Sequence, residues 1–100
     1  DWTRWSFLFG RRAAVRALPF DRQDSFHLLE IGCGTGRNLA LARRHFPQAR
    51  LTGMDVSADM LAHARRRLGA VEGVKLLEQP YQPGYYTWTE RLDTILFSSP

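Results

Sequence analysis

The sequence predicts an α/β fold in which parallel strands form a sheet between layers of helices. Short apolar runs alternate along the chain with longer segments whose apolar residues recur every three or four positions. The first pattern is typical of strands buried on both faces of a parallel sheet, and the second is typical of amphipathic helices. Strands that alternate with helices are joined by right-handed crossovers, so the sheet is expected to be parallel.

The chain has 100 residues, which limits it to one small domain. We expect residues 1–25 to form a helical leader and residues 26–100 to form the α/β domain. The last apolar run, residues 92–97, has the composition of a central buried strand, and a domain rarely stops on such a strand. We therefore expect the chain to be an N-terminal fragment of the full domain, truncated after its fourth strand.

The leader is predicted to be a helix over residues 1–18, because its apolar residues fall near one face and Pro19 ends it. Residues 20–25 then form a polar linker. The apolar run at residues 26–31 stops at glycines, as a buried strand would. A helix is expected over residues 36–46, where a proline follows.

A second strand is predicted over residues 50–54, ending at Asp55. Ser57 is expected to cap the next helix, which runs until Gly69 stops it. A third strand is predicted over residues 74–77, and after an irregular stretch a fourth over residues 92–97.

The charge pattern does not favour nucleic acid as a partner. The net charge is +4, and Lys75 is the only lysine, so arginine carries the basic character. A basic chain can bind nucleic acid, anionic lipid or an acidic substrate. The arginines are scattered over several predicted helices, without a compact basic stripe that carries aromatic residues, so nucleic-acid binding is not expected.

Cys33 is the only cysteine, which excludes an internal disulfide and a cysteine-based metal site. No histidine is placed to activate it, so we expect a small residue that fills tight space. The three histidines share no metal-ligand spacing, and no metal is expected. The chain has no apolar run of about 20 residues, and its cysteine content fits a reducing compartment, so a cytoplasmic location is expected.

A glycine-rich loop with the sequence Glu-Ile-Gly-Cys-Gly-Thr-Gly, residues 30–36, joins the first strand to the following helix. In α/β folds, nucleotide-like ligands bind at this position, beyond the carboxyl ends of the strands. Glycine permits backbone angles closed to other residues and removes side chains from the path of a ligand. Asp55, at the end of the second strand, can accept hydrogen bonds from the vicinal hydroxyls of a ribose.

The loop differs from a dinucleotide-binding loop in two ways. The dinucleotide pattern is G-x-G-x-x-G, whereas here the position of the third glycine carries Arg37. The acidic Glu30 before the loop would repel a pyrophosphate and would suit a ligand that bears positive charge. A nicotinamide-dependent oxidoreductase is therefore the weaker alternative.

Residues 29–36 and 53–61, in this order and at this distance, resemble the class I S-adenosylmethionine-dependent methyltransferase family. The resemblance covers roughly residues 26–97 and implies a Rossmann-like fold with S-adenosylmethionine as cofactor. In that family the loop lies under the methionine part of the cofactor, the acid holds the ribose, and nearby apolar side chains pack on the adenine. The residues at these positions are Glu30, Gly32, Cys33, Gly34, Gly36, Asp55, Val56 and Met60.

The sequence departs from the family after the third strand, where a polar residue beside the adenine is common. Gln79 can serve there, although Pro80 alters the local path. Ser98 follows the fourth strand, where the family begins its substrate pocket, and we place it in the cofactor site. Methyl transfer is an in-line displacement for which the protein supplies proximity, alignment and a dry site. No general base is identifiable, so no catalytic residue is assigned.

The leader, at residues 3–11, resembles that of methyltransferases that N-methylate the diacylglyceryl homoserine headgroup of betaine lipids. This implies an amine acceptor such as a lipid headgroup, a role in lipid metabolism, and peripheral contact with an anionic membrane. The alternative is a cap helix that packs on the sheet, with another small molecule as acceptor. A non-catalytic or truncated cofactor-binding module is the competing function: if the natural chain ends at Pro100, an acceptor pocket cannot form.

Overall fold

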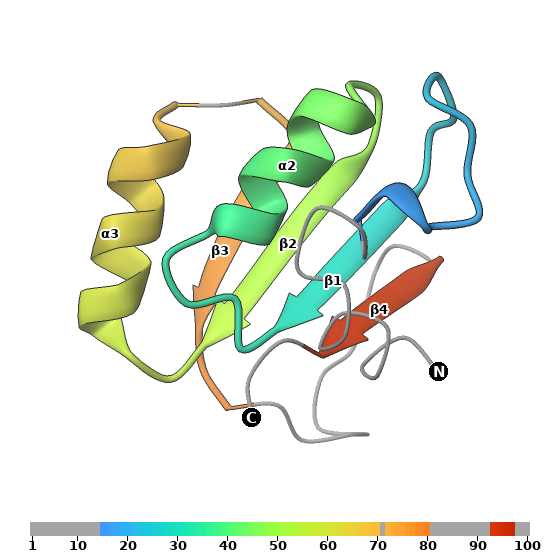
Figure 1. Ribbon diagram of the computed structural model, residues 1–100. Helices are drawn as coiled ribbons and strands as arrows, with labels where there is room; N and C mark the ends of the chain where they lie inside the picture. The colour runs from blue at the N-terminus through green and yellow to red at the C-terminus, as the bar shows by residue number, and fades with distance from the viewer. Residues whose placement is uncertain (1–14, 71, 81–92, 98–100) are drawn as a thin grey trace.

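The chain folds into a four-stranded parallel sheet with two helices (Figure 1). This computed structural model describes residues 15–70, 72–80 and 93–97. The elements follow in the order β1 (His27–Ile31), α2 (Arg37–His45), β2 (Arg50–Asp55), α3 (Ala58–Leu68), β3 (Val74–Glu78) and β4 (Thr94–Phe97). The strand order is β3-β2-β1-β4, and every neighbouring pair is parallel, which confirms the predicted fold class.

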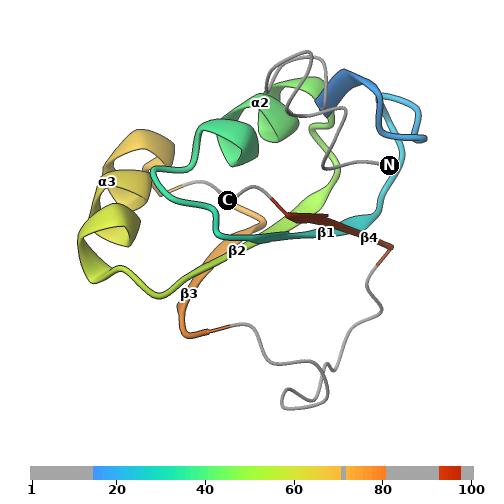
Figure 2. The same ribbon diagram turned by 60° about the horizontal axis from the view of Figure 1, so that its bottom comes forward.

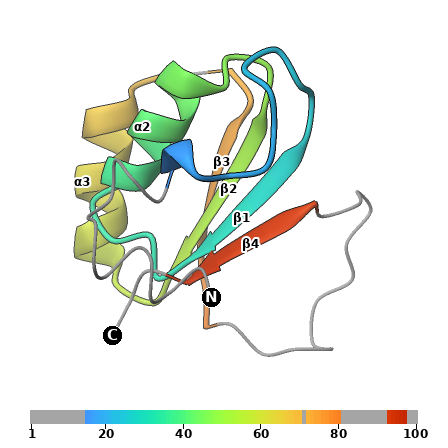
Figure 3. The same ribbon diagram turned by 45° about the vertical axis from the view of Figure 1, so that its right-hand side comes forward.

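Helices α2 and α3 cover the same face of the sheet (Figure 2). The segment from residue 15 to residue 22 lies beside α2 on that side (Figure 3). Both helices are crossover connections between neighbouring parallel strands, and the constant right-handedness of such crossovers places them together. The described residues supply helices for this face only.

The core lies between the sheet and the two helices, as the apolar spacing predicts. In β1, Leu28 and Leu29 are only 2% and 0% exposed, as expected for a strand with neighbours on both sides. The helices contribute buried residues at a spacing of three or four positions: Leu39 and Ala42 of α2, Phe46 at its end, and Leu61, Ala64 and Leu68 of α3.

The helix ends also follow the sequence. Ser57 Oγ accepts a hydrogen bond of 3.2 Å from the Met60 amide, and Gly69 ends α3 with a φ of 64°. At the end of α2, the Arg43 guanidinium donates to the carbonyl oxygens of Pro47, at 2.7 Å, and Ala49, at 2.6 Å. These bonds satisfy carbonyl groups in the turn that leads into β2.

The structure corrects two details before and after the sheet. Phe20, predicted within a polar linker, instead stacks on Phe26 with ring centroids 3.8 Å apart, because burying aromatic area outweighs its polar neighbourhood. The fourth strand begins at Thr94 and not at residue 92. Asp93 precedes it, is exposed, and exchanges two hydrogen bonds of 2.9 Å with the backbone of His27, one through its carboxylate.

Most of the predicted leader helix lies outside the described residues. Its last part is described, and there the helix ends at Arg16 and not at residue 18, because the residue before a proline disfavours helical angles. Val15 and Leu18 are buried, at 2% and 5% exposure.

Candidate functional site

Parallel pairing gathers the ends of the strands at one edge of the sheet. Ile31, the last residue of β1, lies opposite Met54 in β2 and Phe97 in β4, and Asp55 lies opposite Glu78. The chain runs from β1 outward through β2 to β3 and then returns to place β4 on the other side of β1. This reversal is the switch point where open α/β sheets bind ligands, and the glycine loop begins there.

The glycine loop has a backbone that only glycine adopts without strain. Gly32, Gly34 and Gly36 have φ values of 74°, 56° and 81°, in the left-handed region that disfavours side chains. A Cβ on Gly36 would lie 3.1 Å from the Cβ of Ala64, whereas a Cβ on Gly34 would meet nothing within 4 Å. Gly36 is thus needed for helix packing as well, and Gly34 faces open space.

The Asp55 carboxylate ties the glycine loop to the turn that follows β2. Its Oδ2 accepts a hydrogen bond of 2.9 Å from the Gly34 amide, and its Oδ1 accepts one of 2.9 Å from the Ser57 amide. A carboxylate has about four acceptor positions. Two therefore remain for the hydroxyls of a ligand, so the observed bonds do not compete with the predicted role.

Three more loop amides are engaged within the protein. Gly32 and Cys33 both donate to the carbonyl oxygen of Met54, at 2.7 and 3.1 Å, and Gly36 donates to that of Cys33 at 3.0 Å. A loop that cradles a phosphate points its N–H groups at the ligand instead. This loop therefore offers a smooth glycine surface, which argues against a pyrophosphate ligand.

Glu30 lies beneath the loop, and its side chain is not exposed beside it. It is 1% exposed, and its Oε2 accepts a hydrogen bond of 2.8 Å from Nδ2 of Asn38. The carboxylate can therefore act on a ligand through its charge and by positioning the start of α2. Asn38 was missed by sequence analysis, although a polar residue just before the buried Leu39 is a signal that could have found it.

Cys33 fills space under the loop, as predicted. It is 6% exposed, and burial, aided by the negative charges of Glu30 and Asp55, raises its pKa to about 12. A Cβ on Gly53 would lie 2.8 Å from Cys33 Sγ and 2.6 Å from Leu39 Cδ1, so Gly53 makes this packing possible. Cys33 is thus an inert thiol.

Apolar side chains are exposed around the same edge. Val56 is 69% exposed, Met60 45% and Phe97 43%, and among the described residues these are the exposed large hydrophobic side chains. The first two stand at positions that the family resemblance assigns to the adenine. Phe97 was expected within a buried strand but is exposed, because it lies at the end of β4. Strands β1 and β4 flank the switch point. An aromatic residue at the carboxyl end of one of them is a signal that could have indicated a ligand contact.

Two further residues complete this edge. Gln79 is half-buried. Its backbone N–H donates to the Asp55 carbonyl oxygen at 3.0 Å, which places Gln79 next to Asp55 at the ends of the strands. Arg67, in the last turn of α3, donates through its Nε to the Thr35 carbonyl oxygen at 3.0 Å. Ser98 lies outside the described residues.

Neither a metal centre nor a bilayer-crossing helix is found in the part of the chain that the structure describes. There, the side chains of His, Cys, Asp and Glu form no group of three or more that could hold a metal ion. The helices of those residues are too short or too polar to cross a bilayer.

Residues 29–97 match the family described as the methyltransferase domain. The chain belongs to this family. The match spans the glycine loop, Asp55 and β4, which together make the edge described above.

Known proteins resemble different extents of the chain. The trans-aconitate 2-methyltransferase of Rhodopseudomonas palustris (strain BisB18) is 47% identical over 57 residues, which are 57% of this chain and 22% of that protein. The crystal structure of YjhP from E. coli superposes with a TM-score of 0.69 at 27% identity, over 94% of this chain and 37% of YjhP. Coclaurine N-methyltransferase, bound to N-methylheliamine and SAH, has a TM-score of 0.63 at 19% identity, over 88% and 27% of the two chains, and so shares the fold.

The state of Cys33 gives a direct test of the loop packing. A pKa of about 12 in place of 9.0 lowers the thiolate fraction at pH 8 by about a thousandfold. We expect iodoacetamide at pH 8 to leave Cys33 unmodified in the folded protein and to alkylate it fully in urea, as measured by mass spectrometry. Alkylation of the folded protein within tenfold of the unfolded rate would show that the loop is open and the packing is wrong.

Proposed function

We propose that this chain binds S-adenosylmethionine and forms the cofactor-binding part of a methyltransferase that uses it. One observation carries the proposal: a loop of positive-φ glycines is locked onto the Asp55 carboxylate at the switch point of the sheet. This arrangement offers a smooth surface and negative charge, which suit a cationic ligand that contains a ribose. The chain spans about a fifth of the length of the relative named above, so the activity of the whole protein is part of this proposal.

The methionine part of the cofactor would lie over Gly32, Gly34 and Gly36. The sulfonium and ammonium groups carry positive charge, and the carboxylates of Glu30 and Asp55 supply negative potential there. Glu30 lies beneath the loop and Asp55 is bonded to it through the Gly34 amide, so both carboxylates are close to the proposed position of these groups. The remaining acceptor positions of Asp55 would receive the ribose hydroxyls.

The adenine would cover exposed apolar side chains. Val56 and Met60 stand at this edge of the sheet, one directly after Asp55 and the other in the first turn of α3. Covering such apolar area contributes roughly 25 cal/mol per Å². Gln79 would offer its side-chain amide to the edge of the base, and Ser98 would border the site beyond β4.

The bound cofactor supplies a methyl group on a sulfonium, which is a good leaving group. The residues of this chain bind and orient it, and the packed loop keeps water from the face beneath it. We assign no general base among them. The structural neighbour bound to SAH supports a cofactor of this kind through its shared fold.

For the methyl acceptor we propose an amine, such as a lipid headgroup, with the leader in peripheral contact with a membrane. The support is the likeness of residues 3–11 to betaine-lipid N-methyltransferases. A small carboxylic acid is the second candidate, because the relative from R. palustris is named for trans-aconitate. That relative aligns over about half of this chain, so the likeness supports the cofactor more strongly than it supports the acceptor.

Replacing Gly34 by alanine tests the cofactor site, and Gly69→Ala is its matched control. Both glycines have positive φ, 56° and 64°, and at both an added Cβ meets nothing within 4 Å. Each change should cost about 1–2 kcal/mol of backbone strain. We expect Gly34→Ala alone to weaken S-adenosylmethionine binding, by at least about tenfold in calorimetry, because its methyl group would stand where the ligand lies.

Wild-type protein should bind S-adenosylmethionine and not NADH in the same experiment. Equal affinities of the two alanine variants would contradict the placement of the ligand over the loop. Saturable binding of NADH alone would overturn the methyltransferase proposal in favour of a dinucleotide enzyme.

The acceptor class is tested with isotopically labelled methyl donor. Purified protein is incubated with diacylglyceryl homoserine in vesicles or with trans-aconitate, and methyl incorporation is measured in each product. We expect label in the lipid amine. Label in trans-aconitate alone would replace the amine by the second candidate while leaving the cofactor proposal intact.

A further inference from the structure

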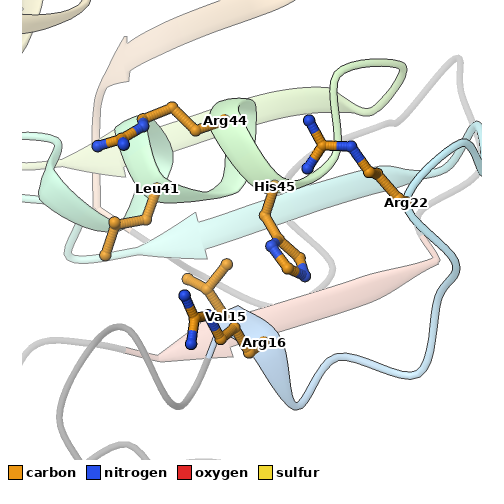
Figure 4. Close-up of a pocket in the computed structure, with 6 residues that line it drawn as sticks. All are labelled: Val15, Arg16, Arg22, Leu41, Arg44 and His45. Carbon is orange, nitrogen blue, oxygen red and sulfur yellow. The ribbon is translucent and has the colours of Figure 1, made fainter.

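A pocket lies away from the glycine loop, between the C-terminal half of α2 and the segment before β1 (Figure 4). Its volume is about 310 Å³, within the range of small-molecule sites. The lining residues are Val15, Arg16, Arg22, Leu41, Arg44 and His45. Since α2 begins at the loop and rises about 1.5 Å per residue, Arg44 lies about 12 Å further along its axis than Gly36.

The lining is strongly basic. Three guanidinium groups and an imidazole come from two separate segments, and none of the described lining residues carries a carboxylate. Within the described residues, the structure shows no hydrogen bond or ion pair for the side chains of Arg16, Arg22 and Arg44. Figure 4 shows these guanidinium groups spread around the pocket, and their charges together create a positive potential that attracts anions.

The helix dipole accounts for only part of this cluster. Cations near the end of α2, such as Arg44 and His45, are stabilised by the negative end of the helix. Arg16 and Arg22 belong to another segment, so the dipole gives no reason for them to line the same pocket. An anionic ligand would account for all four.

We propose that this pocket binds a small molecule that carries a phosphate or diphosphate group, at a site separate from the cofactor site. A phosphate presents several charged oxygens, and a guanidinium group binds such oxygens through paired hydrogen bonds. Val15 and Leu41 give the wall an apolar part for the rest of the ligand. The concave shape favours a soluble ligand over the flat surface of a membrane. The proposal is independent of the methyltransferase proposal.

The test is a calorimetric titration of the folded protein with inorganic pyrophosphate at physiological ionic strength. Arg16→Gln and Arg22→Gln each remove one positive charge from the pocket. Arg65→Gln removes the same charge from the exposed end of α3 and serves as the matched control. We expect each pocket variant to weaken binding by at least about tenfold, and the control to bind as the wild type does.

All three arginines are exposed, so the variants should keep their fold, which circular dichroism will verify. Equal loss of affinity in the three variants would show a nonspecific charge effect and overturn the proposal. So would the absence of saturation below about 10 mM, or binding to phosphatidic acid vesicles without binding to pyrophosphate. Displacement of pyrophosphate by S-adenosylmethionine would place both in one site and would also overturn it.

Discussion

The Asp55 carboxylate is the contact on which the ligand edge of this protein depends. A loop of three glycines has more backbone freedom to lose than other sequences, so its folded shape needs tethers. Asp55 supplies one by accepting hydrogen bonds from Gly34 and Ser57, each at 2.9 Å. Hydrogen bonds to a charged group contribute roughly 1.5–3 kcal/mol, enough to order both turns before any ligand arrives.

The same loop is held from beneath by packing that only small residues allow. Gly36 approaches Ala64 of α3, and Gly53 of β2 leaves room for Leu39 and Cys33. The loop is therefore fixed to both helices and to two strands, and it leaves one smooth side uncovered at Gly34. A site ordered in advance in this way loses little further entropy when a ligand binds. In the proposed function, recognition depends on surface shape and on the charge of the buried Glu30 and the half-buried Asp55. The amides of the three loop glycines and of Cys33 stay bonded within the protein.

Much of this arrangement could be predicted from the sequence, because it follows from local patterns. The apolar periodicity and the glycine and serine signals predicted the ends of every described helix and strand to within two residues. The position of Asp55 at the end of the second strand indicated that it lies near the glycine loop. What could not be predicted depends on contacts between distant residues. The bond from Arg67 to Thr35, the stacking of Phe20 and the buried pairing of Glu30 with Asn38 require the fold itself. The gathering of arginines from two segments into one pocket is likewise invisible in sequence spacing.

The most direct measurement is the affinity for S-adenosylmethionine of Asp55→Asn beside that of Asp59→Asn, by calorimetry. Both variants lose one negative charge near the start of α3, but only Asp55 joins the loop to the strand. The amide keeps the size of the side chain while replacing one acceptor oxygen by a donor. We expect a loss of about tenfold to a hundredfold for Asp55→Asn and an unchanged affinity for Asp59→Asn. Equal affinities would contradict this expectation, because the loop and the ribose would then not depend on this carboxylate.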